Sequence, residues 1–437
     1  MATITLILAP LLLSLASALT PGPNPEVHPK LTTWKCTKAG GCTPQNSVIV
    51  LDQLAHPVYQ VDAPTLNCGT WGNAPNATVC PDEATCAKNC IVDGISDYEK
   101  YGIKTEGGSL VMNQLDKDGR VVSPRAYLLN QEGDKYEMLK LSGGELSFDV
   151  DSSKLPCGMN GALYLSEMEE DGGKSELNPT GASYGGGYCD AQCYTLPFIN
   201  GVVSLPIPST QVRQVLMGEM QANIDAKGSC CNEMDIWEAN AEATSIAPHT
   251  CNQTSLYKCT PDECAFDGVC DKWGCSYNPY AQGNKDYYGR GMTVDTNRPF
   301  TVVTQFPEVN GTMTEIRRLY VQDGKVIKNA AVNTTGVPGI DFMNDADLCG
   351  KPGVAARYID LGGTAGMGKA LGRGMVLIFS VWWDEGGFMN WLDSGNTGPC
   401  NATEGDPKVV LQVEPNPAVT LSNVKWGEIG STYTGTA

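Results

Sequence analysis

Short stretches of alternating or continuously apolar residues recur along the chain and predict β-strands. The segment Glu145–Asp151 alternates polar and apolar side chains with a period of two, as a half-buried antiparallel strand does. Helical periodicities are few, and the 49 glycines together with Asn and Asp favour turns between the runs. Many short strands separated by such turns are typical of a β-sandwich or a β-barrel, so we expect an all-β chain. The other strand-like runs are Ser47–Leu51, Ser109–Asn113, Thr301–Phe306 and Met375–Trp382.

One strand-like stretch, Glu233–Asn240, carries three carboxylates, those of Glu233, Asp235 and Glu238. On a regular strand Glu233 and Asp235 share a face, whereas Glu238 has an odd offset and points to the other face. A β-bulge near Ile236–Trp237 would return Glu238 to the first face, and bulges are frequent next to active sites. Glycoside hydrolysis requires two carboxyl groups, one ionised and one protonated. A solvated acidic edge strand would show the same pattern, so both interpretations are open at this point.

The N-terminus carries an apolar run, Leu6–Leu15, followed by Ala16-Ser17-Ala18. This order is typical of a secretory signal peptide, although a basic residue near Met1 is missing, and we expect residues 1–18 to be removed. No later run is long and apolar enough to cross a membrane. We therefore predict a secreted, extracellular protein whose residues 19–437, without an internal repeat, form a single domain.

The chain has eighteen cysteines, an even number that predicts up to nine disulfides in a secreted protein. Zinc binding by Cys86 and Cys90, or by Cys189 and Cys193, is the alternative. Secretion, the even count and the presence of only three histidines disfavour it. Glycosylation sequons agree with export and begin at Asn76, Asn252, Asn310, Asn333 and Asn401.

The formal net charge of −19 disfavours nucleic acid as a partner, because phosphate backbones would be repelled. A neutral polysaccharide is compatible with this charge. Three tryptophans, Trp382, Trp383 and Trp391, cluster late in the chain. They could belong to the core, or their flat rings could stack on sugars. Strand parity places Trp382 and Trp383 on opposite faces, so at most one of that pair can face a ligand.

Several motifs together resemble glycoside hydrolase family seven, the fungal cellulases. The resemblance runs from about Glu26 to Ile429, and its motifs occur in the family's order. The matching stretches are Glu26–Thr33, Asn160–Tyr164, Gly187–Cys193, Cys230–Asn240 and Met389–Gly395.

This resemblance implies a jelly-roll β-sandwich of two large curved antiparallel sheets with a long substrate cleft, and retaining cleavage of β-1,4-glucan without a cofactor or metal. It assigns Glu233 as the nucleophile and Glu238 as the acid/base, with Asp235 between them and hydrogen-bonded to Glu233. We attribute a raised pKa of Glu238 to the charges of Glu233 and Asp235. The substrate-binding residues that the resemblance implies are Asn160, Tyr164, Asp190, Gln192, His249, Trp382 and Trp391.

The resemblance also implies a pairing that uses every cysteine once. Two of its bonds would tie the Asp190–Gln192 segment to the start of the catalytic strand. The pairs are Cys36–Cys42, Cys68–Cys90, Cys80–Cys86, Cys157–Cys400, Cys189–Cys231, Cys193–Cys230, Cys251–Cys270, Cys259–Cys264 and Cys275–Cys349.

Some segments depart from the family's cellobiohydrolases. A tryptophan-rich segment is replaced by Asp52–Tyr59, Ala281 stands where an arginine is usual, and the link Asp393–Cys400 is short. These features are similar to the open-cleft endoglucanase branch, here without a linker and a cellulose-binding module.

The segment Val202–Asn223 fits neither branch. It is either a longer loop or a retained intervening sequence, which peptide mapping would distinguish.

The sequence thus predicts a monomeric, secreted, retaining endo-β-1,4-glucanase whose partner is a polysaccharide, without nucleic acid or membrane. The first alternative is a cellobiohydrolase of the same family. A non-catalytic, lectin-like glucan-binding module is a second alternative, because fold does not determine function. Such a module has no need for Glu233 and Glu238 together. An inert disulfide-rich structural protein would leave the motifs unexplained.

Overall fold

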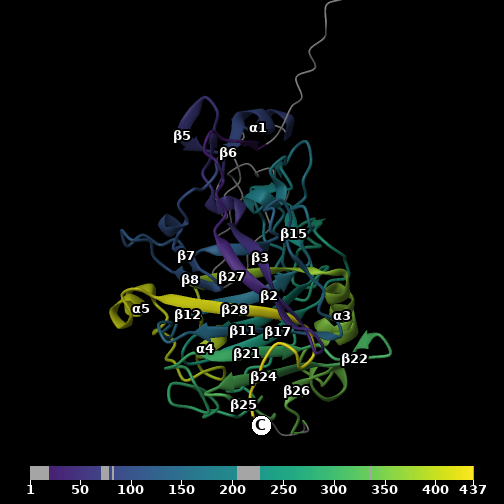
Figure 1. Ribbon diagram of the computed structural model, residues 1–437. Coiled ribbons are helices and arrows are strands. Elements are labelled where there is room, and N and C mark those ends of the chain that lie inside the picture. The colour runs from purple at the N-terminus through teal and green to yellow at the C-terminus, as the bar shows by residue number, and fades with distance from the viewer. Residues whose placement is uncertain are drawn as a thin grey trace, which may run out of the picture.

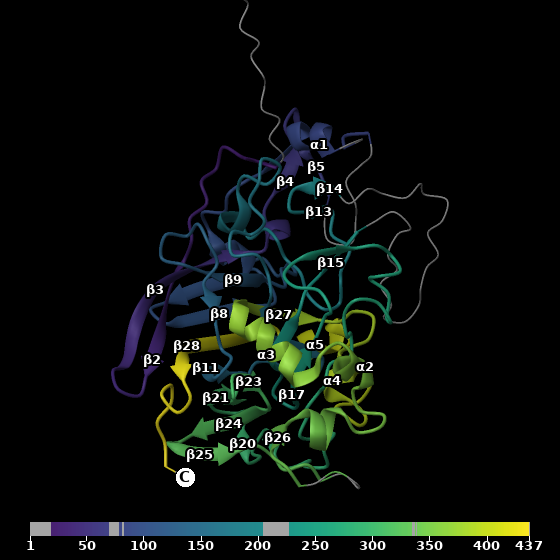
Figure 2. The ribbon, with the colours of Figure 1, turned by 90° about the vertical axis from the view of Figure 1, so that its right-hand side faces the viewer.

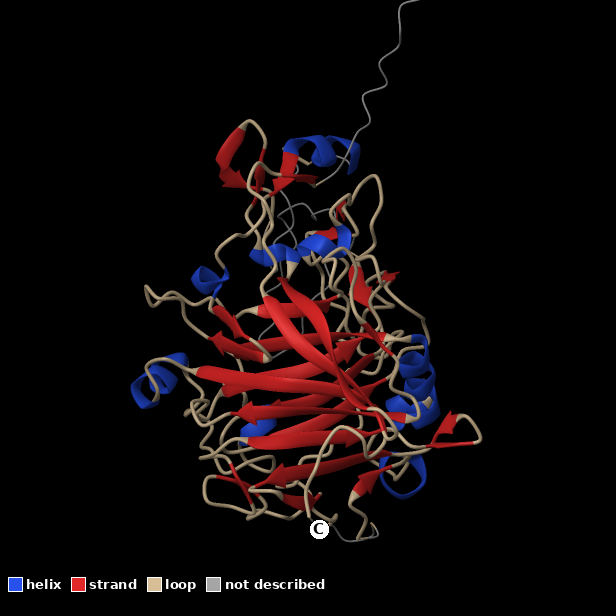
Figure 3. Cartoon of the chain, in the orientation of Figure 1, coloured by secondary structure: helices blue, strands red, loops and turns tan. Residues whose placement is uncertain are grey.

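The computed structural model describes residues 19–69, 78–80, 83–203, 227–333, 337 and 339–436. Strands dominate the described part of the chain, and short helices lie at its periphery (Figure 3). None of the helices in this part is both long and apolar enough to cross a membrane. The helices are α1 (Glu83–Asn89), α2 (Ala356–Asp360), α3 (Gly363–Arg373), α4 (Asn390–Asp393) and α5 (Pro407–Val413), with further 3-10 and π-helical turns at Gln53–Ala55, Tyr98–Tyr101, Gly181–Tyr184 and Asp345–Cys349.

The main sheet is one hydrogen-bonded path in the order β17-β16-β12-β27-β9-β3-β2-β28-β11-β21-β24-β25. Its bounds are β17 (Thr244–His249), β16 (Glu233–Ala239), β12 (Met159–Ser166), β27 (Met375–Trp383), β9 (Arg125–Leu129), β3 (Gly41–Leu51), β2 (Lys30–Thr37), β28 (Ala418–Glu428), β11 (Gly144–Asp151), β21 (Phe300–Gln305), β24 (Ile316–Gln322) and β25 (Lys325–Lys328). Four strands pair beside this path, namely β7 (Ile103–Glu106), β8 (Ser109–Asn113), β10 (Met138–Leu139) and β26 (Phe342–Met343).

This path folds over into two layers that meet in the core. We call β17 to β3 the inner layer and β2 to β25 the outer layer; the long β2–β3 hairpin joins them (Figures 1 and 2). The ring of Phe148 in β11 meets the ring of Trp237 in β16 edge to face at 6.1 Å, although their strands are far apart in the path. Side chains of both layers share one buried apolar cluster. The predicted all-β sandwich is therefore confirmed.

The strand pairing corrects one detail of the prediction, because the path is not wholly antiparallel. The contact between β2 and β28 is parallel, with Trp34 opposite Lys425. The other neighbouring pairs along the path are antiparallel. Smaller sheets are formed by β1 (Thr20–Pro21), β4 (Val58–Gln60), β5 (Ala63–Asn67) and β6 (Cys90–Val92); β13 (Phe198–Ile199) and β14 (Val202–Val203); β15 (Gly228–Cys230) and β18 (Tyr257–Cys259); β19 (Tyr288–Gly289) and β20 (Val294–Asp295); and β22 (Glu308–Val309) and β23 (Thr312–Met313).

Four of the five strand-like runs predicted from the sequence lie within a strand, and the fifth, Thr301–Phe306, extends one residue past the end of β21. The expectation that β11 is half-buried is wrong, since Glu145 on its polar side is fully buried. The chain near the C-terminus covers it: the main-chain N–H groups of Gly430, Ser431 and Thr432 donate to the Glu145 carboxylate at 2.7–2.9 Å. A buried carboxylate is tolerated when donors surround it in this way.

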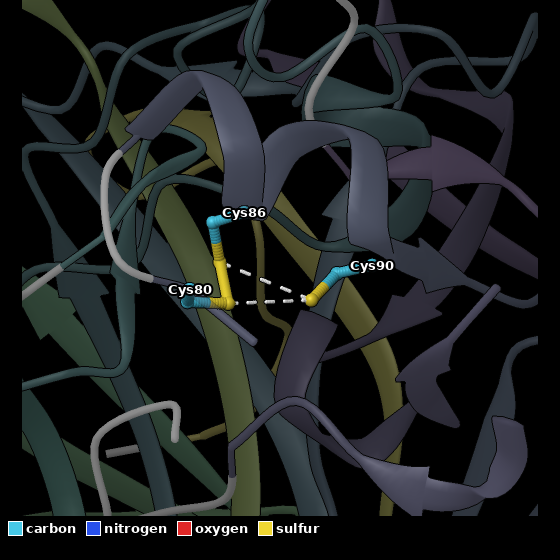
Figure 4. Close-up of side chains that lie close together, drawn as sticks. All are labelled: Cys80, Cys86 and Cys90. Carbon is cyan, nitrogen blue, oxygen red and sulfur yellow. Dashed lines mark hydrogen bonds between the residues drawn. A yellow bond between two sulfur atoms is a disulfide. The ribbon is translucent and has the colours of Figure 1, made fainter. Parts of the chain in front are cut away.

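The structure contains nine disulfides, and they join the pairs that the family resemblance implies. Figure 4 shows the bond between Cys80 and Cys86 beside the sulfur of Cys90, which is itself bonded to Cys68. Each cysteine considered above as a zinc ligand (Cys86, Cys90, Cys189 and Cys193) is therefore bonded to a different cysteine in a disulfide. The Cys80–Cys86 bond joins α1 to the segment just before it, and the Cys68–Cys90 bond joins β6 to the residue that follows β5, at one end of the molecule far from the C-terminus (Figure 1).

Four predicted glycosylation asparagines are exposed: Asn252, Asn310, Asn333 and Asn401. Asn76 lies outside the described residues, as do the expected signal peptide and residues 204–226, which hold most of the unmatched segment that begins at Val202.

Candidate active site

The catalytic stretch forms β16, and a β-bulge at Ile236 places its carboxylates on one face. Against β12, Trp237 lies opposite Leu163 and Asp235 opposite Tyr164, so Ile236 is the extra residue. Against β17 the register also shifts between Asp235 and Glu238. Because one residue is skipped, Glu238 returns to the side of Glu233 and Asp235 while Trp237 enters the core. The predicted bulge is confirmed, and we call this side of the inner layer the carboxylate face.

The bulge also shortens the distance between the two glutamates. Glu233 lies opposite Ser166 and Glu238 lies opposite Ala162, which are four positions apart on β12. At about 3.3 Å per residue, these four positions span roughly 13 Å instead of the roughly 16 Å of five regular positions. Two long side chains that lean inward can bridge this span.

Glu238 is held by Asn160 of β12. The Asn160 side-chain oxygen accepts from the Ala239 N–H at 3.1 Å, so its amide group is directed at Glu238 and donates to Oε1 at 3.0 Å. Burial raises the pKa of Glu238 to about 8, and the charge of Asp235 adds to this effect. The attribution made from the sequence therefore needs correction, because desolvation comes first and Asp235 second.

Glu233 lies beside the Asp190–Gln192 segment. The Ala191 N–H donates to Glu233 Oε2 at 3.0 Å. Burial and the neighbouring carboxylates of Asp235 and Asp190 raise the pKa of Glu233, whereas His249 and the Ala191 N–H favour its ionised form. Because of these opposing effects, the charge state of Glu233 depends on whether the neighbouring carboxyl groups of Asp235 and Asp190 are protonated.

Asp235 contacts His249 in this structure. His249 Nδ1 lies 3.0 Å from the Asp271 carbonyl oxygen, so Nδ1 carries a hydrogen and donates it. His249 Nε2 lies 3.0 Å from Asp235 Oδ2, which is within hydrogen-bonding distance. The expected hydrogen bond from Asp235 to Glu233 stays a prediction, and it requires that Asp235 hold a proton.

The other polar residues that the resemblance implies gather around Glu233. Asp190 accepts from the Tyr188 hydroxyl at 2.7 Å, and the hydroxyls of Tyr188 and Tyr164 lie 3.2 Å apart. Gln192 Nε2 donates to the carbonyl of Lys272 at 2.9 Å, and the Lys272 ammonium donates to the carbonyl of Gln192. Burial raises the pKa of Asp190 and lowers that of Lys272.

The tryptophans separate by strand parity as predicted. Trp383 belongs to the core, whereas Trp382, opposite Asn160, stacks with Trp391 at 6.5 Å between ring centroids. Trp391 is 45% exposed and lies on α4. The last residue of α4, Asp393, accepts from the Gly158 N–H and the Asn240 amide, both at 2.7 Å, and so fixes Trp391 beside the ends of β12 and β16.

Sequence reasoning missed several residues of this site. Arg125 stacks on the Tyr188 ring at 3.4 Å and forms an ion pair with Asp52 at 3.0 Å. Lys272 lies between Cys270 and Cys275, which both form disulfides. The close spacing of these two cysteines in the sequence could have indicated a rigid loop at Lys272. Arg318 has no local signal, because it reaches β16 from the opposite layer.

Comparison with known proteins places these observations in a family. A model of glycosyl hydrolase family 7 matches residues 22–433. Endoglucanase EG-1 of Humicola insolens is 54% identical over 430 residues, which cover 98% of this chain and 94% of that protein. The native structure of the Humicola insolens endocellulase EGI has a TM-score of 0.88 at 54% identity, covering 95% of this chain and 100% of that chain.

A cellobiohydrolase structure from Daphnia pulex is similar at lower identity. It has a TM-score of 0.84 at 33% identity and covers 95% of this chain and 100% of that chain. Since the family model and the relatives match nearly the whole length, the chain belongs to glycosyl hydrolase family 7.

Proposed function

We propose that the chain is a secreted endo-β-1,4-glucanase that cleaves internal bonds of cellulose and related β-glucans with retention of configuration. The observation that carries the proposal is the bulge at Ile236, which gives Glu238 the same face as Glu233. A glucan chain lying across the carboxylate face would meet both groups. The similarity to Humicola endoglucanase EG-1 supports the endo-acting assignment.

The reaction would proceed by double displacement. The ionised Glu233 attacks the anomeric carbon and forms an ester as the glycosidic C–O bond breaks. Glu238 gives its proton to the departing oxygen, which its raised pKa allows at neutral pH. Glu238, now ionised, takes a proton from water, the water attacks the same carbon, and the ester to Glu233 breaks.

Internal cleavage is also supported by the compact segment after α4. The side-chain amide of Asn278 donates to the carbonyls of Leu392 and Thr397, at 3.1 and 2.8 Å. The Thr397 hydroxyl donates to Ser394, so the Asp393–Cys400 link folds back on itself. A short link that folds back in this way fits an open cleft, which a polymer can enter sideways as an internal cut requires.

The lectin-like alternative is less well supported, because sugar binding alone does not require two glutamates on one face. The nine disulfides fit an extracellular protein. We further propose that residues 1–18 are a signal peptide, that residues 19–437 form a single catalytic domain, and that the protein acts as a monomer on a neutral polysaccharide.

The test is hydrolysis of soluble carboxymethylcellulose by the purified secreted protein, with mixed-linkage glucan and xylan as comparison substrates. We expect viscosity to fall steeply while few reducing ends appear. If cellobiose dominates from the first minutes and the viscosity hardly changes, the cellobiohydrolase alternative replaces this proposal. Binding to the polymer without any release of reducing ends would favour the lectin-like module.

A further inference from the structure

Two exposed aromatic side chains lie beyond the catalytic strands and belong to no residue set described above. Trp273 is 70% exposed and Phe266 is 46% exposed. Their ring centroids are 5.4 Å apart with an interplanar angle of 67°. Exposed large rings are costly in water, and a pair of them on a fixed backbone points to a ligand.

The backbone that carries Trp273 is rigid. Disulfides anchor it on both sides, through Cys270 to Cys251 and through Cys275 to Cys349. The Trp273 N–H donates to Asp271 Oδ1 at 3.2 Å. A ring held in this way loses little conformational freedom when a ligand binds.

The segment is also joined directly to the active site. Asp271 accepts from His249 Nδ1, and Lys272 exchanges hydrogen bonds with Gln192. Gly274 has a φ of +68°, and a Cβ there would lie 2.8 Å from Cε1 of His249, so only glycine allows this close approach. Because His249 Nε2 faces Asp235, residues 272–274 border the carboxylate face.

Trp382 and Trp273 lie on opposite sides of the catalytic strand β16. Trp382 lies on β27, two strands from β16 on one side. On the other side, the segment that carries Trp273 pairs with β17, since the N–H groups of Cys275 and Tyr277 donate to the carbonyls of Pro248 and Ile246. The two aromatic sites thus flank the catalytic carboxylates. A glucan chain that stacks on Trp382 and passes Glu233 and Glu238 would reach Trp273 next.

We infer that Trp273 and Phe266 form a second sugar-stacking platform, which binds the β-1,4-glucan chain where it continues past the catalytic carboxylates on the β17 side. This inference rests on the proposed glucanase function. Apolar pyranose faces are the surface that flat rings stack on. The platform therefore adds affinity only for substrates long enough to reach it.

The experiment compares Trp273→Ala with the wild type on cellotetraose, cellohexaose and an aryl β-cellobioside. We expect KM for cellohexaose to rise about three- to tenfold in the variant, the effect of losing one ring contact. The change should be smaller for cellotetraose and below about twofold for the aryl glycoside, and Trp273→Tyr should restore most of the affinity. The cleavage position in cellohexaose should shift as well.

The matched control is Leu66→Ala, which removes another exposed apolar side chain, one that lies on β5. It should leave each KM unchanged. Equal KM changes for long and short substrates, or no change for any, would overturn the platform. A wild-type protein that hydrolyses none of these substrates would instead overturn the proposed function. The affinity for cellohexaose, measured by binding to the inactive variant Glu233→Gln and to the double variant Glu233→Gln/Trp273→Ala, separates an effect on binding from an effect on turnover.

Discussion

The guanidinium of Arg318 donates a hydrogen bond to the main-chain carbonyl of Ile236, the extra residue of the catalytic bulge. Arg318 lies on β24 of the outer layer and is 3% exposed, so the bond crosses the core between the layers. Its Nε also donates to the Thr304 hydroxyl at 3.2 Å. Among the described residues, no carboxylate forms an ion pair with it. A bulge breaks the regular ladder, and this donor satisfies the carbonyl that the bulge turns inward.

Replacing Arg318 by Met should therefore loosen the bulge more than it unfolds the protein. We expect kcat to fall about tenfold with KM nearly unchanged, because a misplaced catalytic group affects the transition state. Burying a guanidinium that has no carboxylate partner among the described residues is itself costly. Removing this charge therefore offsets part of the stability lost with the hydrogen bond, and Tm should change little. Kinetics on a soluble glucan and thermal melts measure both.

The matched control is Arg317→Met on the same strand, whose side chain is exposed and paired with Glu315. It should leave kcat unchanged. Arg318→Lys should restore part of the rate, since an ammonium can still reach the carbonyl. A parallel loss of Tm and kcat in Arg318→Met, without rescue by lysine, would mean that the residue only supports the fold.

The strands, the bulge and the shared face of Glu233 and Glu238 could be predicted because they depend on local periodicity and parity. Arg318 could not, because its contact joins residues 82 positions apart through the packing of two layers. The same reason explains Glu145: its alternation matches a solvated position, but residues near the C-terminus bury it. The leading cause of the Glu238 pKa also escaped the sequence, since burial is a property of the folded chain.

The roles of the two glutamates predict different defects. Glu233→Gln should abolish turnover and prevent a covalent glycosyl-enzyme, whereas Glu238→Gln should still be glycosylated by a substrate with a good leaving group, which needs no proton. Azide should then restore part of the turnover of Glu238→Gln by replacing activated water. Mass spectrometry detects the intermediate, and proton NMR should show the β-anomer first. Azide rescue of Glu233→Gln instead, or an initial α-anomer, would reverse the assignment.

The disulfide between Cys193 and Cys230 should support activity as well as stability. Cys230 forms an isolated bridge with Asp190, next to the Ala191 N–H that binds Glu233. Replacing both cysteines by serine should cost about 2–4 kcal/mol and lower kcat. Replacing Cys36 and Cys42, which join β2 to β3 far from Glu233, should lower Tm but leave kcat unchanged. An equal kcat in both double variants would show that the first bond does not position Glu233.

The raised pKa of Glu238 predicts how activity depends on pH. Its proton is needed for leaving-group departure, so kcat/KM should fall as the pH rises through about 8. Asp235 contributes to this shift, so Asp235→Asn should move the alkaline limb to lower pH. Asp262→Asn, at an exposed position, is the control and should leave the limb in place. If the alkaline limb of the kcat/KM profile does not move in Asp235→Asn, the limb belongs to a group other than Glu238.

The same pKa makes Glu238 costly for stability. The folded state holds the proton up to a pH of about 8, whereas the unfolded chain releases it near the ordinary glutamate pKa of 4.5. Between these values the folded state binds more protons, so stability falls by about 1.4 kcal/mol for each pH unit of increase. Below about 4.5 both states hold the proton and the cost disappears.

Glu238→Gln removes this titration but keeps an oxygen that can accept from the Asn160 amide. The variant should therefore melt a few degrees above the wild type near neutral pH, and the difference should shrink toward zero at about pH 4. Glu99→Gln, at an exposed position, should show no such trend. Thermal melts across this pH range provide the test. A Glu238→Gln variant less stable than the wild type at neutral pH, or a difference independent of pH, would contradict the raised pKa.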